Sequence, residues 1–194
     1  MDDTPAADVT HADDGAAPAG WRDPVIEPPP GVDIRPARPS DASTYHRMWK
    51  TVVEERRWVR TETVRHSARQ FRKLFRDSWS DRRARLVAVA RGRVIGSLTI
   101  ERIDHPVNRH VATLGMAVEA SWRGKRVGSA LMAEALRWAR SAGVEKVTLE
   151  VYPGNEAARR LYRRFGFTEE GRLVRQSKKS YGYEDEIIMS RWLA

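Results

Sequence analysis

The chain has 194 residues, with 35 Lys and Arg against 26 Asp and Glu, and so a formal net charge of +9. Its length suits one domain with a core large enough to fold without disulfides. It has no cysteine, which excludes a disulfide framework, thiolate metal sites and a cysteine nucleophile. No apolar run approaches the roughly 20 residues that span a bilayer, and the acidic, polar N-terminus does not resemble a secretory signal. We therefore expect a cytoplasmic protein, and the positive charge predicts an anionic partner.

The charge is unevenly distributed along the chain. Residues 1–30 contain seven acids, one Arg and six of the ten prolines, so this segment carries about −6 and the remainder +15. The segment has few apolar residues and no helical or strand period. The sequence therefore predicts a disordered acidic tail over 1–30, followed by a single domain over 31–194.

Hydrophobic periodicity predicts seven strands and four helices in this domain. Helix and turn signals support several of them, because Pro39-Ser40-Asp41 can begin a helix, Arg91-Gly92 suits a tight turn and Gly143 and Gly166 suit helix ends. The predicted elements are a strand at 32–35, helices at 41–58 and 64–79, strands at 86–90, 93–100 and 111–119, a helix ending near 141, a strand at 146–151, a helix at 156–165, and strands at 167–175 and 183–191. This order predicts an α/β fold, a mixed sheet with helices on both faces.

Residues 111–141 predict a site for a phosphate or pyrophosphate. An apolar strand leads into a loop with two glycines and three basic residues, and a helix follows. The first turn of a helix leaves N–H groups unpaired and carries a positive partial charge, and glycine lets a phosphate approach the backbone. Neither the P-loop spacing nor the dinucleotide pattern G-x-G-x-x-G is present, which excludes those two classes of nucleotide site.

The loop sequence Arg123-Gly124-Lys125-Arg126-Val127-Gly128 resembles the acetyl-CoA signature [RQ]-x-x-G-x-[GA] of the GCN5-related N-acetyltransferase (GNAT) superfamily. Arg126 departs from this pattern by replacing the middle glycine. A second block, residues 149–167, resembles the superfamily's L-x-V-x-x-x-N-x-x-A-x-x-L-Y-x-x-x-G-F at the expected distance after the loop. The chain is therefore identified as similar to GNAT acetyltransferases over about 110–170.

This resemblance implies a GNAT fold, whose mixed, mostly antiparallel sheet splays apart at the acetyl-CoA site. It implies an acetyl-CoA-dependent N-acetyltransferase in which the amine attacks the thioester directly, in agreement with the missing cysteine. The splayed strands 114–119 and 147–152 would receive the pantetheine arm, and a backbone N–H near Val118 would polarise the acetyl carbonyl. The implied cofactor-binding residues are Met116, Ala117, Val118, Arg123, Gly124, Lys125, Arg126, Val127, Gly128, Ser129, Asn155 and Tyr162.

Two residues of the second block are candidates for proton transfer. By resemblance, Tyr162 is the general acid that protonates the departing thiolate, and Glu150 is the general base. Strand alternation predicts that Glu150 lies on the same face as Thr148. Glu101 and Glu119 compete for the role of base, acting through a water if needed, and an acceptor that enters already neutral needs no carboxylate.

Other features bear on cofactors and partners. Asn155 has two compatible roles, as the cap of the helix at 156–165 and as a contact to pantetheine or an ordered water. The five histidines show no metal-ligand spacing, so we expect no metal. The strongly basic stretch 56–85 indicates either nucleic-acid binding or a solvated helix face, and we favour the solvated face.

The acceptor is less well defined than the cofactor. The chain end at 181–189 resembles a branch that acetylates small amines, including free amino acids. We therefore expect a small-molecule amine such as an amino acid as the acceptor, no membrane partner, and a homodimer as in many superfamily members. Two alternatives stay open, an acetyltransferase for protein N-termini such as those of ribosomal proteins, and a catalytically silent module that binds CoA or associates with nucleic acid.

Overall fold

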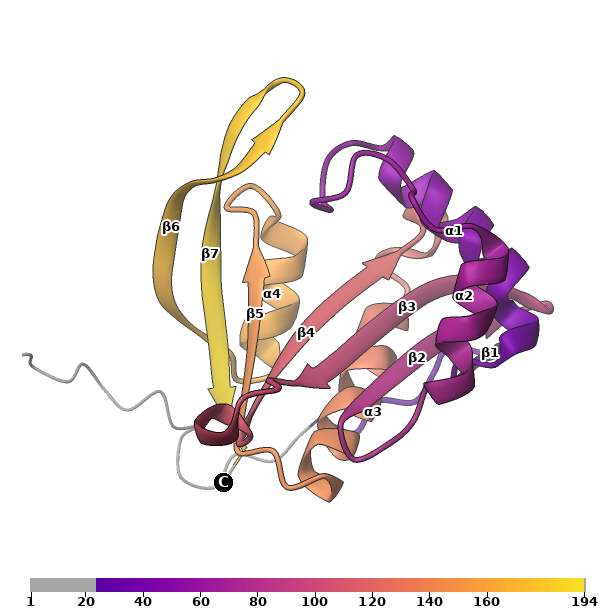
Figure 1. The fold of residues 1–194 in the computed structure, drawn as a ribbon, viewed down its shortest axis with the longest axis horizontal. Helices are drawn as coiled ribbons and strands as arrows, with labels where there is room; N and C mark the ends of the chain where they lie inside the picture. Colours follow the sequence, from indigo (N-terminus) through magenta and orange to yellow (C-terminus); the bar gives the residue numbers. More distant parts are fainter. Residues whose placement is uncertain (1–23, 194) are drawn as a thin grey trace, which may run out of the picture.

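The computed structural model describes residues 24–193 and has a seven-stranded sheet at its centre, with strand order β1-β2-β3-β4-β5-β7-β6 (Figure 1). Neighbouring strands are antiparallel except β4 and β5, which are parallel. The strands are β1 (Val32–Pro36), β2 (Arg83–Ala90), β3 (Arg93–Arg102), β4 (Val111–Val118), β5 (Lys146–Val151), β6 (Thr168–Lys179) and β7 (Gly182–Trp192). The predicted mixed sheet is confirmed, while most of the predicted tail over 1–30 lies outside the described residues.

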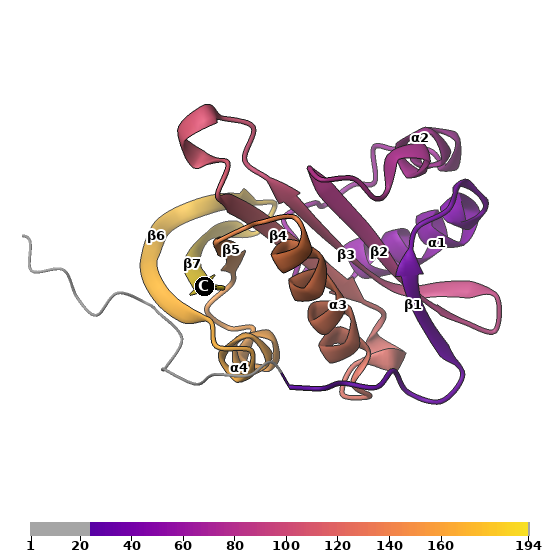
Figure 2. The same ribbon diagram turned by 90° about the horizontal axis from the view of Figure 1, so that it is seen from below.

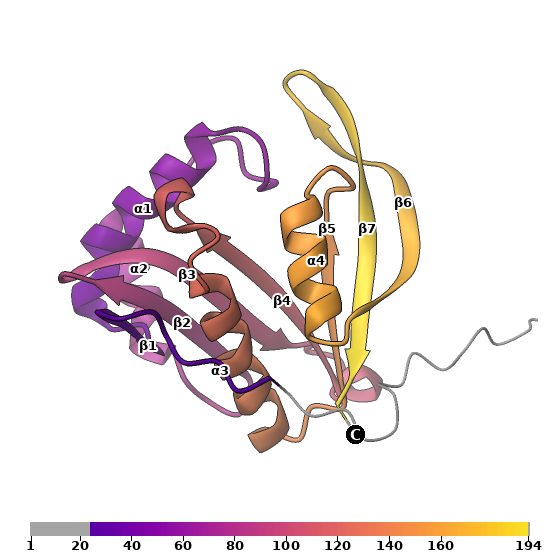
Figure 3. The same ribbon diagram turned by 180° about the vertical axis from the view of Figure 1, so that it is seen from behind.

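Four α-helices cover the two faces of the sheet, as predicted. They are α1 (Ala42–Glu54), α2 (Ala68–Leu74), α3 (Val127–Ser141) and α4 (Glu156–Arg164). The first two lie on one face and the last two on the other (Figures 2 and 3). Each face has its own apolar core, in which Met48 and Phe71 are buried on the α1–α2 face and Leu131 and Trp138 on the α3–α4 face. None of the helices within residues 24–193 is long and apolar enough to cross a membrane.

The first predicted helix, 41–58, is too long at its C-terminal end. α1 ends at Glu54, and Arg56 takes a left-handed backbone conformation with φ of 51°. A right-handed helix cannot continue through such a residue. The chain leaves the helix here because residues 55–67, which we call the bridge loop, make contacts with distant parts of the molecule that are described below.

The second predicted helix, 64–79, is too long at both ends. α2 begins only after Ser67, whose hydroxyl accepts a hydrogen bond from the Gln70 N–H while the Gln70 side chain accepts one from the Ser67 N–H. This reciprocal pair is a capping box, and its S-x-x-Q spacing is a signal that the sequence analysis overlooked. At the other end, Trp79 forms an isolated β-bridge with Ala84 and is 46% exposed, so it is not part of an apolar helix side.

Candidate active site

The centre of the sheet opens where β4 and β5 separate. Their pairing runs from Val111 opposite Lys146 to Leu114 opposite Leu149, and the described residues hold no pair of these two strands beyond it. β4 nevertheless continues to Val118, and the two strands form an open V in Figure 1. This is the splay that the sequence resemblance implied.

The splay leaves backbone donors of β4 pointing into the gap. The N–H of Glu119 donates to the carbonyl of Ile95 in β3, at 3.0 Å. Successive residues of a strand point their N–H groups to opposite sides, so the N–H groups of Val118 and Met116 face the side from which β5 has departed. The backbone here presents hydrogen-bond donors to whatever occupies the gap.

The loop before α3 places the start of that helix against the splay. Gly124 and Arg126 both have left-handed backbones, with φ of 73° and 63°, and they turn the chain from β4 into the helix. Gly128, in the first turn, packs so closely that a Cβ there would lie 3.3 Å from Cδ2 of Leu161 and 3.5 Å from Sδ of Met116. The first turn of α3 has no acidic residue, so its N–H groups and positive dipole end suit an anion.

The basic side chains of this loop make their own contacts within the protein. Arg123 donates to both carboxylate oxygens of Glu55, at 2.7 and 2.8 Å, and to the carbonyl of Val118 at 2.9 Å. Lys125 lies over the ring of Trp122, with Nζ 5.4 Å from the ring centroid. Since Arg123 already holds the loop to the end of α1, the backbone of the loop is the part best suited to contact phosphates.

Helix α4 carries two of the predicted residues. The side-chain oxygen of Asn155 accepts a hydrogen bond from the Ala158 N–H at 3.3 Å, which confirms the capping role. Tyr162 is 6% exposed and belongs to the core on the α3–α4 face, with its ring centroid 6.0 Å from that of Phe167. Burial raises the pKa of Tyr162 to about 12, so its hydroxyl keeps its proton throughout the neutral range.

Glu150 lies on the opposite face of the sheet from Tyr162. Its neighbours Leu149 and Val151 are buried in the core beside α3 and α4, so Glu150 points toward the α1–α2 side. Leu149 is the last β5 residue paired with β4, which puts Glu150 at the beginning of the splay. Its side chain is 36% exposed and forms an ion pair with Arg60 of the bridge loop.

The two competing carboxylates occupy different surroundings. Glu101 lies opposite Thr113 in the paired part of the sheet, before the splay begins, and forms an ion pair with Arg83 at 2.5 Å. Glu119 follows β4 and is held by Arg93 through two hydrogen bonds of 2.8 and 2.9 Å. Of the three carboxylates, Glu150 alone lies at the point where the strands begin to separate.

The bridge loop crosses the open end of the splay, a feature that the sequence analysis missed. It begins at Glu55, bound to Arg123, and the ring of Trp58 then lies against Gly154 in the turn after β5. Further along, Nζ of Lys179 donates to the carbonyls of Val59 and Arg60, at 2.5 and 3.0 Å.

The loop is tied to the β6–β7 hairpin at two more places. The carboxylate of Glu62 accepts hydrogen bonds from the N–H and hydroxyl of Ser180, the latter at 2.9 Å. Arg60 binds Glu186 of β7, which is 126 residues away in the chain. No local sequence pattern marks such pairs, because only the tertiary fold brings their partners together.

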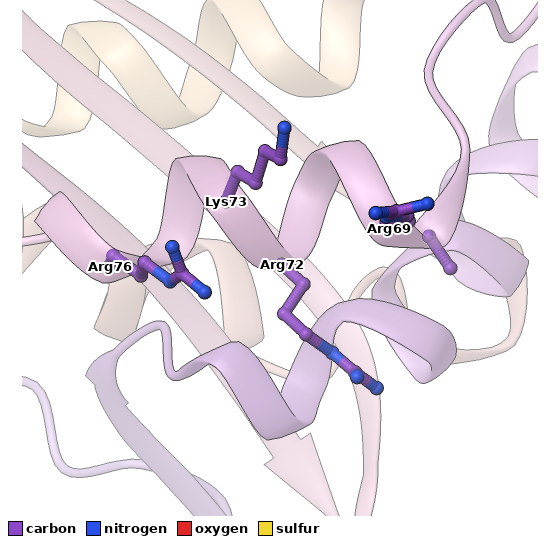
Figure 4. A pocket seen from close by; sticks show the side chains of 5 residues that line it. Arg69, Arg72, Lys73 and Arg76 are labelled. Carbon is purple, nitrogen blue, oxygen red and sulfur yellow. The ribbon is translucent and has the colours of Figure 1, made fainter.

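A separate hollow of about 420 Å³ lies along α2 and the turn after it, away from the splay (Figures 1 and 4). It is lined by Ala68, Arg69, Arg72, Lys73 and Arg76. Figure 4 shows the four basic side chains pointing in different directions from the helix rather than converging on one point. This surface belongs to the basic stretch 56–85 and has the character of a solvated helix face. Within residues 24–193, no group of three or more His, Asp or Glu side chains is placed to hold a metal.

Comparisons with known proteins agree with this geometry. The profile of the Acetyltransferase (GNAT) family matches residues 49–167. The L-amino acid N-acetyltransferase AaaT of Escherichia coli is 33% identical over 123 residues, which cover 58% of this chain and 74% of the relative.

Two solved structures share the fold. A ribosomal-protein-alanine N-acetyltransferase of Brucella melitensis matches with a TM-score of 0.76 and 26% identity, over 83% of this chain and 99% of that chain. A phosphinothricin acetyltransferase of Sinorhizobium meliloti, solved in complex with AcCoA, matches with a TM-score of 0.76 and 20% identity, over 84% of this chain and 89% of that chain. With the family profile covering more than half of its length, the chain belongs to the GNAT family of acetyl-CoA-dependent N-acetyltransferases.

Proposed function

We propose that this enzyme acetylates the α-amino group of a free amino acid or a closely related small amine. The observation that carries the proposal is the bridge loop, which pairs with Glu150 through Arg60 and is tied to the β6–β7 hairpin on the far side of the splay. A loop bound across the acceptor side leaves less room there for a polypeptide than for a small molecule. The E. coli relative, an L-amino acid N-acetyltransferase, supports the same acceptor class.

The cofactor side of the proposed site binds acetyl-CoA through backbone groups. The N–H groups at the start of α3 and in the loop 124–128 hold the pyrophosphate, since they combine free donors with a positive dipole end. The N–H of Val118 donates to the acetyl carbonyl and stabilises the negative charge that develops on its oxygen during attack. Asn155 keeps the start of α4 in place beside the pantetheine arm.

The acceptor side activates the amine. Glu150 accepts a proton from the acceptor's ammonium group, and the neutral amine then attacks the thioester carbon directly. The carbon–sulfur bond breaks and CoA leaves as a thiolate, while the acetylated nitrogen gives up its remaining extra proton, which the thiolate takes up to become the thiol. The proton held by Glu150 passes to solvent.

Tyr162 stabilises the departing sulfur from the opposite face of the sheet. With a pKa of about 12, its hydroxyl is a hydrogen-bond donor throughout the neutral range. Full transfer of its proton to a thiolate with a pKa near 8.5 is unfavourable, because Tyr162 is the weaker acid. We therefore assign Tyr162 a hydrogen bond to the developing thiolate, which needs only partial movement of the proton.

A protein N-terminus is the second candidate acceptor. The solved structure of the Brucella ribosomal-protein-alanine N-acetyltransferase, at 26% identity, is the observation that favours it. For the N-terminal ammonium of a polypeptide to pair with Glu150, Arg60 of the bridge loop would have to leave that carboxylate. The homodimer, the cytoplasmic location and the absence of nucleic-acid binding stay predictions.

The test measures thiol release from acetyl-CoA over a panel of free amino acids, simple amines and peptides with free N-termini. We expect free amino acids to give the highest kcat/KM, and Glu150→Gln to lower it about 100-fold without weakening acetyl-CoA binding. Glu101→Gln is the matched control and should retain activity, because Glu101 lies in the paired part of the sheet.

Three outcomes would change this proposal. Preference for peptides would favour the alternative acceptor. Binding of acetyl-CoA without turnover of any amine would indicate a silent module. Loss of activity in Glu101→Gln but not in Glu150→Gln would move the general base.

A further inference from the structure

Arg60 of the bridge loop lies between the proposed base, Glu150, and a second carboxylate, Glu186. Its Nε donates to both carboxylate oxygens of Glu186, at 2.9 and 3.0 Å, and its terminal nitrogen forms ion pairs with Glu186 and with Glu150. One guanidinium thus joins the proposed base to a second carboxylate on β7. The Arg60 side chain is 53% exposed, so it remains accessible to a molecule entering the acceptor side.

Glu186 is a fixed anchor for this arginine. Its side chain is 2% exposed, and its Oε1 also accepts a hydrogen bond from the Ser177 hydroxyl at 2.5 Å. Burial acts to raise the pKa of Glu186, but hydrogen bonds from Arg60 and Ser177 outweigh it and hold the pKa below its ordinary value. A buried carboxylate that stays ionised keeps its cation strongly, because losing that partner would leave an uncompensated charge.

Glu150 is held less firmly than Glu186. Among the described residues, its ion pair with Arg60 is the contact that neutralises it, and its side chain is 36% exposed. While Arg60 occupies this carboxylate, the ammonium group of an acceptor cannot pair with it. Glu150 can act as a base only after Arg60 has turned away from it, and Arg60 can do so while remaining bound to Glu186.

The charge of the cluster decides which acceptor can cause this change. Glu150 and Glu186 carry two negative charges, and Arg60 and Lys179 carry two positive ones. A simple amine brings an additional cation beside Arg60, which is repelled in surroundings partly shielded from water. A zwitterionic amino acid brings one charge of each sign, so its carboxylate can take the guanidinium and its ammonium can take Glu150 with no change in net charge.

We propose that Arg60 is the residue that selects the acceptor, by binding the carboxylate of a free amino acid and thereby releasing Glu150 to accept the ammonium proton. Glu186 is the positioning residue that holds Arg60 in place during the exchange. This inference rests on the proposed function and identifies the part of the acceptor that the enzyme recognises.

The test compares each amino acid with its own carboxamide, which keeps the side chain and the amine but lacks the negative charge. The α-amino group of the carboxamide is the less basic of the two, so basicity alone would favour the carboxamide. We expect the wild-type enzyme to prefer the acid by at least about 100-fold in kcat/KM. Arg60→Ala should reduce that ratio at least about 10-fold, mainly through KM for the amino acid. Arg60→Lys should restore it partly, since Lys keeps the charge but not the paired donors.

Two further variants separate recognition from folding. Arg65→Ala changes an exposed arginine of the same loop that makes no ion pair within the described residues, so the ratio should stay at its wild-type value. Glu186→Gln should lower the ratio as Arg60→Ala does, because Arg60 loses its anchor. Acetyl-CoA binding reports in every variant whether the cofactor side is intact.

If Arg60→Ala failed to fold, competition in the wild-type enzyme would decide the question. The deaminated carboxylic acid with the same side chain should inhibit amino-acid acetylation competitively, and the matching neutral amide should not. Equal turnover of acids and carboxamides by the wild-type enzyme would overturn the role of Arg60 while leaving the amine acetyltransferase intact. A uniform loss on both substrates in Arg60→Ala would overturn it too, whereas turnover of peptides alone would overturn the proposed function.

Discussion

The two sides of the splay are built in different ways. The proposed cofactor side consists of backbone N–H groups from β4 and from the loop and helix over 118–128, a stretch continuous in the sequence. The acceptor side consists of side chains from the bridge loop, β5 and the β6–β7 hairpin, which are far apart in the chain. The proposed acetyl-CoA site is therefore encoded locally, whereas the proposed selection of the acceptor depends on long-range packing.

The two sides also differ in how they respond to substitution. A backbone donor cannot be removed by changing one side chain, so the cofactor side is sensitive mainly to added bulk or to backbone strain. On the acceptor side, one substitution changes the charge that an acceptor meets. Each of the following variants changes a residue on one side of the splay, and they are ordered from the largest expected effect to the smallest.

Tyr162→Phe should lower kcat by about 100-fold and leave acetyl-CoA binding nearly unchanged, because only the hydrogen bond to the departing sulfur is lost. Steady-state kinetics together with a binding titration would separate the two quantities. Tyr152→Phe is the matched control, because it removes a tyrosine hydroxyl on the acceptor side instead. That hydroxyl donates a hydrogen bond to the Ser177 hydroxyl at 3.3 Å. An unchanged kcat in Tyr162→Phe would remove Tyr162 from the mechanism.

Because its pKa is about 12, ionisation of Tyr162 should cause no loss of wild-type activity below about pH 11.

Glu186→Gln should destabilise the protein by about 2 kcal/mol at neutral pH, since hydrogen bonds to a charged group are lost. The lowered pKa of Glu186 means that its ionisation stabilises the fold fully above its ordinary pKa of 4.5, and that this contribution is lost as the pH falls through the folded-state value. The unfolding free energy of the variant should therefore vary less with pH below 4.5 than that of the wild type. Denaturant titrations at several pH values measure this difference, and identical pH dependence would contradict it.

Gly128→Val should weaken acetyl-CoA binding about 10-fold or more, because the added atoms must displace Leu161 and Met116 beside the splay. The preference between acids and carboxamides should persist in this variant, since the acceptor side is untouched. Gly171→Ala is the matched control, as a Cβ at that position has nothing within 4 Å. Unchanged acetyl-CoA affinity in Gly128→Val would show that the start of α3 lies away from the cofactor.

Arg126→Gly should stabilise the fold by about 0.5 kcal/mol, because relief of the left-handed strain exceeds the greater freedom of glycine in the unfolded chain. Gly124→Ala introduces the same kind of strain and should destabilise the fold by about 1 kcal/mol. The cost comes from the backbone alone, because the added Cβ would meet nothing within 4 Å. Thermal unfolding measures both changes. A loss of stability in Arg126→Gly would mean that the side chain contributes more than its backbone conformation costs.

Helix ends that carry a local signal, such as a glycine or a capping residue, can be located from the sequence. Gly143 and Gly166 both have positive φ, and they end α3 and α4 as expected. The Ser67 capping box also marks the start of α2. The predicted helix began too early, at residue 64, because the apolar period was extended N-terminally past this cap. The end of α1 at Glu54 had no such signal, because the contacts that draw the bridge loop away come from residues such as Lys179 and Glu186.

The sequence by itself determined the order of strands and helices along the chain, the glycine-containing loop before α3, and the face of β5 that Glu150 shares with Thr148. These depend on contacts between near neighbours, on strand alternation and on helix geometry, all of which act over a few residues. Only the tertiary structure decided that Arg60 joins Glu150 to Glu186 and that the bridge loop is bound to the β6–β7 hairpin. Ion pairs between segments some 90 to 126 residues apart leave no periodic pattern, because folding alone brings their charges together.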